Sequence, residues 1–206
     1  MRQNTITAFL DSLADRTPAP GGGATAALHL GQAAALVSMV ARYSTGPRYA
    51  EHAELIDRLC SSADEIREKA LHFAEADMAA FSSVIDAYRL PKSTEDEAAE
   101  RDQVIATALT NAASVPADVL ASAGAVIELT DQLLPVANRT VISDIAAAAE
   151  AARAAAATAR VNVEVNLGGI PPSDARTALT DALTNVDAMV SQADRITTDV
   201  RKQLNS

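Results

Sequence analysis

The sequence is poor in cysteine, histidine and aromatic residues. Its one cysteine, Cys60, excludes an intramolecular disulfide and a cysteine-based zinc cluster. The three histidines have no spacing typical of metal ligands, so no metal site is predicted. Aromatic residues make up 3% of the chain, with no tryptophan, and the 49% of hydrophobic residues are mostly Ala, Val, Leu and Ile. This composition favours closely packed helices over an aromatic-rich β-sandwich.

Basic residues are also few. Seventeen Lys and Arg against 27 Asp and Glu give a net charge of −10, so we expect neither a nucleic-acid partner nor an anionic membrane surface as a partner. The opening residues, MRQNTITAFLDSLADR, are too polar for a signal peptide, and we therefore expect a cytoplasmic location.

Charge is absent altogether from Thr17 to Ala41. The segment is long enough to raise the question of a membrane span. However, it contains His29, Gln32, three glycines and two prolines, and much of the remainder is alanine, which gains little from lipid. We interpret it as a helix at the centre of a bundle or at a subunit interface.

The remaining segments have a helical period and no β alternation. Three apolar stripes carry this pattern: Ile66–Ala70–Phe73–Asp77–Phe81–Val84; Val141–Ile145–Ala148–Ala152–Ala155–Ala159–Val163; and, without interruption, Leu179–Leu183–Val186–Val190–Ala193–Ile196–Val200–Leu204. The small side chains of the second stripe predict a central helix, because they allow close approach of neighbouring backbones.

Breaks between helices are marked by proline, glycine and capping residues. Pro91 ends one helix and Ser93 or Thr94 caps the next, while Pro116 either starts a helix or kinks a long one. Further breaks are expected around Pro135 and at Gly168–Gly169, after which Ser173 caps the last helix. The prediction is an all-α, single-domain bundle of about six or seven helices over residues 1–206.

Asp77 is the main candidate for chemistry, because it occupies a core-facing step of an apolar stripe. Burying a carboxylate is unfavourable unless it is paired or hydrogen-bonded. The position is explained either by a structural hydrogen bond or stripe-edge position, or by a catalytic acid–base group with a shifted pKa that lines a cleft.

Two further polar pairs flank the alanine-rich helix. Ser143 and Asp144 open it, and capping by Thr140 or Ser143 explains them without any ligand. Asn162 and Asn166 share a face at its far end, where they either tie down the following loop or hold a polar heterocycle.

The glycine run TPAPGGGATAA precedes the charge-free helix. Gly21, Gly22 and Gly23 fit a tight interhelical loop. They also fit a site where free backbone N–H groups at a helix N-terminus meet an anion or a planar ligand.

The order of these motifs resembles one family. FLDSLADRTPAPGGGATAALHLGQAAALVSMVA, then DMAAF at 77–81, RLPKSTEDEAAER at 89–101, ISD at 142–144 and NVEVNLGGI at 162–170 are similar to the cyclodeaminase/cyclohydrolase family. This family comprises the deaminase domain of formiminotransferase-cyclodeaminase and the stand-alone bacterial methenyltetrahydrofolate cyclohydrolases.

The resemblance implies a homodimer with a folate-binding cleft at or near the subunit interface. It implies a tetrahydrofolate derivative as substrate, no tightly bound cofactor, and chemistry at the carbon that bridges two folate nitrogens. Asp77 matches the family's acidic position and is assigned proton transfer, with Asp144 as a second catalytic candidate. Ser143 and Asp144 match the family's Ser-Asp pair, which would orient the pterin or the reacting nitrogen, so Ser143 is a substrate-binding candidate. Lys92 is a candidate for the glutamate tail, although a solvated lysine is the simpler explanation.

One turn departs from the family pattern. Members tend to carry Gly-Asn and a second Asn before the Ser-Asp pair, whereas this chain has Ala137-Asn138-Arg139-Thr140. Asn138 remains a substrate-binding candidate, and the turn is expected to lie beside the site. The departure leaves two alternatives open, namely a relative that cyclises or hydrolyses a non-folate amidine or imine, and a non-catalytic helical dimer.

Overall fold

The computed structural model describes residues 3–205, and this part of the chain contains helices and no strands. Seven α-helices follow one another: α1 (Ile6–Ala14), α2 (Gly22–Tyr43), α3 (Ala53–Tyr88), α4 (Glu95–Leu133), α5 (Ile142–Leu167), α6 (Asp174–Ala182) and α7 (Val186–Leu204). Three short 3-10 turns, Pro47–His52, Leu134–Val136 and Arg139–Val141, lie between them. The predicted all-α bundle is confirmed.

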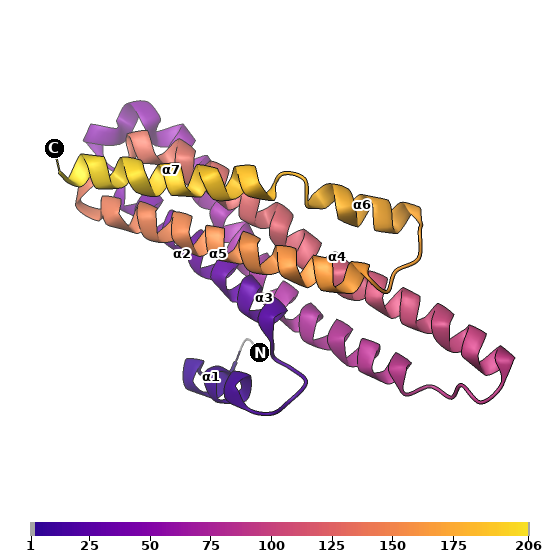
Figure 1. The fold of residues 1–206 in the computed structure, drawn as a ribbon. Helices are drawn as coiled ribbons and strands as arrows, with labels where there is room; N and C mark the ends of the chain where they lie inside the picture. The colour runs from indigo at the N-terminus through magenta and orange to yellow at the C-terminus, as the bar shows by residue number, and fades with distance from the viewer. Residues whose placement is uncertain (1–2, 206) are drawn as a thin grey trace.

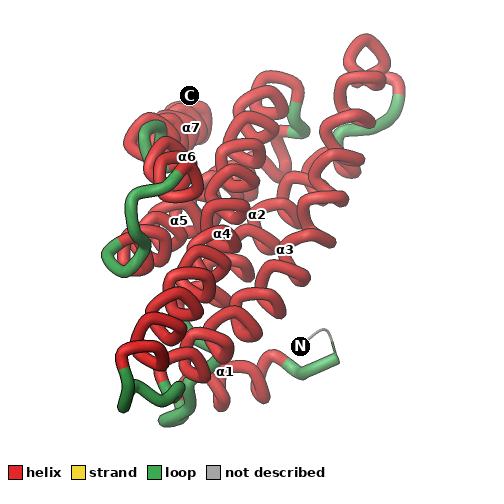
Figure 2. The backbone as a smooth tube through the Cα atoms, turned by 90° about the vertical axis from the view of Figure 1, so that its right-hand side faces the viewer, coloured by secondary structure: helices red, strands yellow, loops and turns green. Residues whose placement is uncertain are grey.

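The charge-free segment forms the centre of the bundle. α2 packs against α3, α4 and α5, and α5 packs in turn against α4 and α7 (Figures 1 and 2). The buried side chains of α2 are mostly alanine, which allows the neighbouring helices to approach closely. Two helices, residues 22–43 and 95–136, are long and apolar enough to span a membrane, a property that buried core helices share. In α2 most of that apolar stretch is buried by protein.

Helix ends follow the capping signals in the sequence. α3 ends at Tyr88, ahead of Pro91, and Thr94 begins α4 with a complete capping box. The Thr94 hydroxyl accepts a hydrogen bond from the Glu97 N–H at 3.2 Å, and the Glu97 carboxylate accepts one from the Thr94 N–H at 3.2 Å. Pro116 lies inside α4, which runs unbroken from Glu95 to Leu133, so the alternative of a helix start at Pro116 is wrong.

The C-terminal stripe does not form one helix, contrary to the expectation. Ser173 caps α6, which ends at Ala182, and α7 begins only at Val186. In the break, the Thr184 hydroxyl donates to the Asp181 carbonyl at 2.7 Å. This local side-chain bond competes with continuation of the helix. The apolar stripe crosses the break, so periodicity alone could not locate it.

Two apolar clusters share α3. A main core contains Ala63, Ala70 and Ala74 of α3, and a smaller core begins at Val84 and includes parts of α4, α5 and α6. Asp77 lies between the two clusters on the same helix. The fold thus places this carboxyl at a gap in the apolar packing.

The capping box at the start of α4 gives a first prediction. Thr94→Ala removes the acceptor for the Glu97 N–H and is expected to lower the free energy of unfolding by about 1 kcal/mol in urea denaturation. Thr107→Ala is a matched control, because Thr107 is exposed inside α4 and donates only to the Gln103 carbonyl. Equal stability of the two variants would contradict the role of the cap.

Candidate functional site

A cavity of about 210 Å³ lies at the N-terminus of α2, where α2, α3 and α5 form most of the wall and α4 contributes Ala112. The glycine run forms one part of its wall, α3 a second and the last turns of α5 a third. The lining residues are Pro18, Ala19, Gly21, Gly22, Gly23, Asp77, Phe81, Ala112, Asn162, Val165 and Asn166. The structure therefore brings together six of the residues that the sequence predicted, namely the three glycines, Asp77 and both asparagines.

Asp77 lies directly against the first turn of α2. A Cβ atom built on Gly23 would lie 1.9 Å from Asp77 Oδ1, a distance that no side chain can occupy. The backbone N–H of Ala24 donates a hydrogen bond to the Asp77 carboxylate. Since α2 has no side-chain cap of its own at Gly21, Asp77 supplies from α3 the acceptor that a capping residue normally provides. Glycine is thus required at position 23 for this close approach.

The pKa of Asp77 is raised above its ordinary value, because partial burial disfavours the charged form. The Ala24 N–H bond lowers the pKa, but its effect is the smaller of the two. Asp77 therefore keeps its proton to a higher pH than an exposed aspartate does. A carboxyl with a raised pKa is a better proton acceptor than an exposed aspartate, and it can return the proton in a later step.

The two asparagines present acceptors to the cavity. Asn162 Nδ2 donates to the Thr158 carbonyl at 2.8 Å, and Asn166 Nδ2 donates to the Asn162 carbonyl at 2.8 Å. One N–H of each side-chain amide is thus engaged by α5 itself, and each amide retains its Oδ1 acceptor and a second N–H. Gly22 lies alongside, since a Cβ there would be 3.3 Å from Asn162 Nδ2. A ligand with N–H groups at its edge is compatible with this wall.

The other predicted site residues lie elsewhere in the chain. Lys92 is exposed in the loop after α3, and the helix end at Tyr88 is roughly 16 Å along its axis from Asp77. Asp144 and Asn162 lie on the same face of α5, five turns and roughly 27 Å apart. Ser143 and Asp144 are therefore not beside Asp77 within one chain.

The turn that departs from the family pattern organises the far end of the bundle. Asn138 donates its backbone N–H to Ser44 Oγ and its Nδ2 to the Tyr43 carbonyl, both at 2.8 Å, which ties this segment to the end of α2. Asn138 Oδ1 accepts from the Thr140 N–H at 3.0 Å. The expectation that the turn lies beside the Asp77 cavity is wrong for a single chain.

Capping of α5 also differs from the expectation. The N-cap residue is Val141, which makes no side-chain cap bond, so neither Thr140 nor Ser143 caps this helix. The Thr140 hydroxyl instead donates to Asn138 Oδ1 at 2.9 Å. Asp144 lies in the first turn, where a negative charge interacts favourably with the helix dipole.

Phe81 is a site residue that the sequence reasoning missed. It was predicted to lie in the core, but 45% of it is exposed and it lines the cavity one turn after Asp77. The sequence contains a signal for this position. Phe81 is four residues after Asp77, so both lie on one helix face, and Asp77 is itself a candidate for the cleft. Val165, 72% exposed, contributes a second apolar wall from α5.

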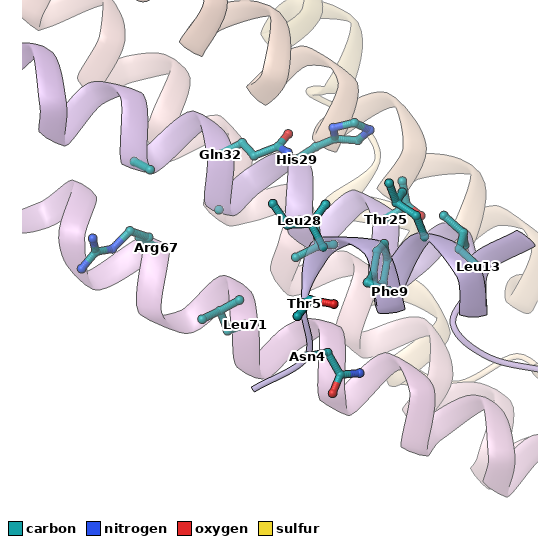
Figure 3. A pocket seen from close by; sticks show the side chains of 14 residues that line it. Asn4, Thr5, Phe9, Leu13, Thr25, Leu28, His29, Gln32, Arg67 and Leu71 are labelled. Atoms are coloured by element: carbon teal, nitrogen blue, oxygen red, sulfur yellow. The ribbon is translucent and has the colours of Figure 1, made fainter. Parts of the chain in front are cut away.

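A larger cavity of about 470 Å³ lies between α1, α2 and α3 (Figure 3). Its walls are mainly apolar, with Phe9, Leu28 and Leu71 among them, and His29 and Arg67 lie at its edge (Figure 3). α1 itself has no buried residue. No predicted site residue lies in this cavity.

The fold and the cavity define an all-α bundle with a half-buried acid at a helix N-terminus, an arrangement suited to proton transfer on a small ligand. Residues 5–187 match the family model described as formiminotransferase-cyclodeaminase. The chain belongs to this family.

Its relatives include separate and fused proteins. The methenyltetrahydrofolate cyclohydrolase of Methylorubrum extorquens is 34% identical over 98% of both chains. The formimidoyltransferase-cyclodeaminase of Rattus norvegicus is 29% identical over 79% of this chain, which covers 30% of that protein. The crystal structure of formiminotetrahydrofolate cyclodeaminase from Thermotoga maritima superimposes with a TM-score of 0.87 at 28% identity, covering 100% of this chain and 99% of that one.

The contact between Gly23 and Asp77 can be tested with matched glycine variants. Gly23→Ala is expected to lower the free energy of unfolding by about 1–3 kcal/mol, because the added methyl group overlaps the carboxyl and forces a backbone shift. Gly21→Ala is the control, since a Cβ there meets nothing within 4 Å. Urea denaturation of both variants measures the effect, and a Gly23→Ala protein as stable as Gly21→Ala would refute the contact.

Proposed function

We propose that this chain is a folate-dependent one-carbon enzyme, a methenyltetrahydrofolate cyclohydrolase or a formiminotetrahydrofolate cyclodeaminase, acting at the carbon that bridges two folate nitrogens. The observation that carries this proposal is the raised pKa of Asp77 in a cavity with main-chain and amide walls. Membership of a family whose named relatives act on such substrates supports it.

Both reactions use one proton-transferring carboxyl. In the hydrolytic direction, Asp77 takes a proton from water as its oxygen bonds to the methenyl carbon, and a neutral tetrahedral adduct forms. The bond from this carbon to N5 then breaks, and N5 takes the proton held by Asp77. The hydroxyl proton of the adduct passes to Asp77 and on to solvent, which yields the neutral 10-formyl compound and one released proton. In the deamination, N10 bonds to the carbon of the formimidinium cation and loses its proton to Asp77. Asp77 then gives this proton to the amino nitrogen as its bond to carbon breaks, so that ammonia leaves and the methenyl cation remains.

We favour the cyclohydrolase within this pair. The support is sequence identity, which is 34% with the Methylorubrum extorquens cyclohydrolase and 28% with the Thermotoga maritima cyclodeaminase, each matched over nearly its full length. The alternative of a non-folate amidine or imine was motivated by the Ala137-Asn138-Arg139-Thr140 turn. The structure weakens this argument, because the turn hydrogen-bonds to the end of α2 and does not line the Asp77 cavity.

We further propose a homodimer in which each site uses residues of both subunits. One face of α5 is uncharged from end to end. Two of its side chains, Val161 and Val165, are 59% and 72% exposed. The face consists of Ser143, Ala147, Ala151, Ala154, Thr158, Val161 and Val165. A second copy is the occupant that suits this face. A two-fold axis near Ala154 would place Asp144 of the partner subunit beside Asn162. The two groups of family motifs would then form one site.

Asp77→Asn tests the catalytic role. We expect kcat to fall by roughly 10²–10⁴ when the loss of 5,10-methenyltetrahydrofolate is followed by absorbance, with 5-formiminotetrahydrofolate assayed in parallel. Asp86→Asn is the control, as Asp86 is exposed on the same helix and pairs with Arg89. Unchanged turnover by Asp77→Asn would remove this carboxyl from the mechanism.

The same variant has a predicted pH dependence of stability. Because the folded-state pKa of Asp77 is raised, wild-type stability falls as pH rises from the ordinary aspartate pKa, about 3.9, through the folded value. At pH 7 Asp77→Asn is therefore expected to melt at the wild-type temperature or above it. The difference in melting temperature between the variant and the wild type should vanish below about pH 3.9, where Asp77 is protonated in both the folded and the unfolded protein. Thermal melts across pH 3–8 provide the measurement.

Subunit complementation tests the shared site. Asp77→Asn and Asp144→Asn are each expected to be inactive, whereas an equimolar mixture after subunit exchange should recover roughly a quarter of wild-type activity, since half the dimers are mixed and one of their two sites is intact. Sites contained within one chain would give no recovery. A monomeric wild-type protein in sedimentation equilibrium that is fully active would also rule out this assembly.

A further inference from the structure

Phe81 is an exposed aromatic residue in a chain with three phenylalanines. A single exposed apolar side chain is ordinary on a protein surface. Phe81 differs because it lines the cavity that holds Asp77, and because it is placed there from the same helix, one turn further on. Its ring is thus held at a fixed spacing from the carboxyl by α3.

The walls around Phe81 leave room for a flat ligand. A Cβ on Gly21 would meet nothing within 4 Å, so a planar group can lie against the main chain there, whereas Asp77 and Asn162 already face Gly23 and Gly22. The volume of about 210 Å³ is below the ~300 Å³ that encloses a whole drug-sized ligand, so only one ring system of a folate fits inside. The Oδ1 atoms of Asn162 and Asn166 are acceptors that the edge of such a ring can use.

Charge identifies which ligand this wall prefers. Among the described residues that line the cavity there is no Lys, Arg or His, and Asp77 is the one titratable group. Both proposed substrates carry an amidine-type carbon between two nitrogens that is cationic at neutral pH, whereas the 10-formyl product is neutral at that carbon. An aromatic face attracts a delocalised cation through its quadrupole.

We propose that Phe81 is a substrate-binding residue whose ring stacks on the cationic one-carbon bridge and, in the cyclohydrolase reaction, distinguishes the cationic methenyl substrate from the neutral 10-formyl product. This inference rests on the proposed function. It explains why an apolar ring remains half exposed at this position: its partner is the substrate and not the core. Asp77 then meets the same carbon from the neighbouring turn of α3.

Steady-state kinetics of Phe81→Leu and Phe81→Tyr provide the main test. Phe81→Leu is expected to raise KM for 5,10-methenyltetrahydrofolate about tenfold, with a smaller change in kcat, while its inhibition constant for 10-formyltetrahydrofolate changes less than threefold. Phe81→Tyr keeps an aromatic face and should stay within about threefold of wild type. Tyr88→Leu is the control, because Tyr88 is exposed on the same helix but outside the cavity.

Fluorescence gives an independent readout of binding. The chain contains no tryptophan, so Phe81→Trp in the Asp77→Asn background carries a single indole. Its emission should be quenched in a saturable way by 5,10-methenyltetrahydrofolate, and Tyr88→Trp in the same background should show no saturable change.

The outcomes separate the two proposals. A wild-type protein active on folate with an unchanged KM in Phe81→Leu would overturn the role of Phe81 and leave the proposed function intact. An equal loss of affinity for substrate and product would overturn the discrimination by charge. A folded wild-type protein inactive on both folate substrates would overturn both proposals.

Discussion

The structure depends on one contact, that of the Asp77 carboxyl with the N-terminus of α2. The first turn of any helix has N–H groups without an intrahelical partner, and α2 has no capping side chain to satisfy them. Asp77 approaches from α3 and accepts one of these hydrogen bonds, which is possible only because residue 23 is glycine. The same contact fixes where α2 begins, joins two helices and holds an acid at the wall of a cavity.

The environment of Asp77 is a balance between burial and hydrogen bonding. A carboxylate with several N–H donors would have a low pKa and would be a poor base, while a fully buried one would remain protonated. Asp77 has one backbone donor, and burial outweighs it, so its pKa is moved upward. Both proposed reactions need a group that takes a proton in one step and returns it in the next. Structural capping and catalysis are therefore two uses of the same geometry.

The fold could be predicted because helical periodicity and capping chemistry are local. Asp77 was found because it interrupts an apolar stripe, and Asn162 and Asn166 because they are four residues apart. The break between α6 and α7 was missed since Leu183 and Val186 continue the stripe across it. Phe81 was assigned to the core because the stripe identifies a helix face but not where that face leaves the core. Which ends of α5 meet which helices depends on tertiary packing, and sequence order carries no information on that.

The separation of the family motifs along α5 follows from this packing. α2 and α5 run antiparallel, since Gly22 lies beside Asn162 while Ser44 binds Asn138. Motifs at the two ends of α5 consequently flank opposite ends of α2. Asp144 and Asn162 nevertheless share one helix face, with an uncharged surface alongside. A rotation of 180° about the middle of that surface exchanges the two ends, so a second copy is the simplest object that can bring both motifs to one ligand.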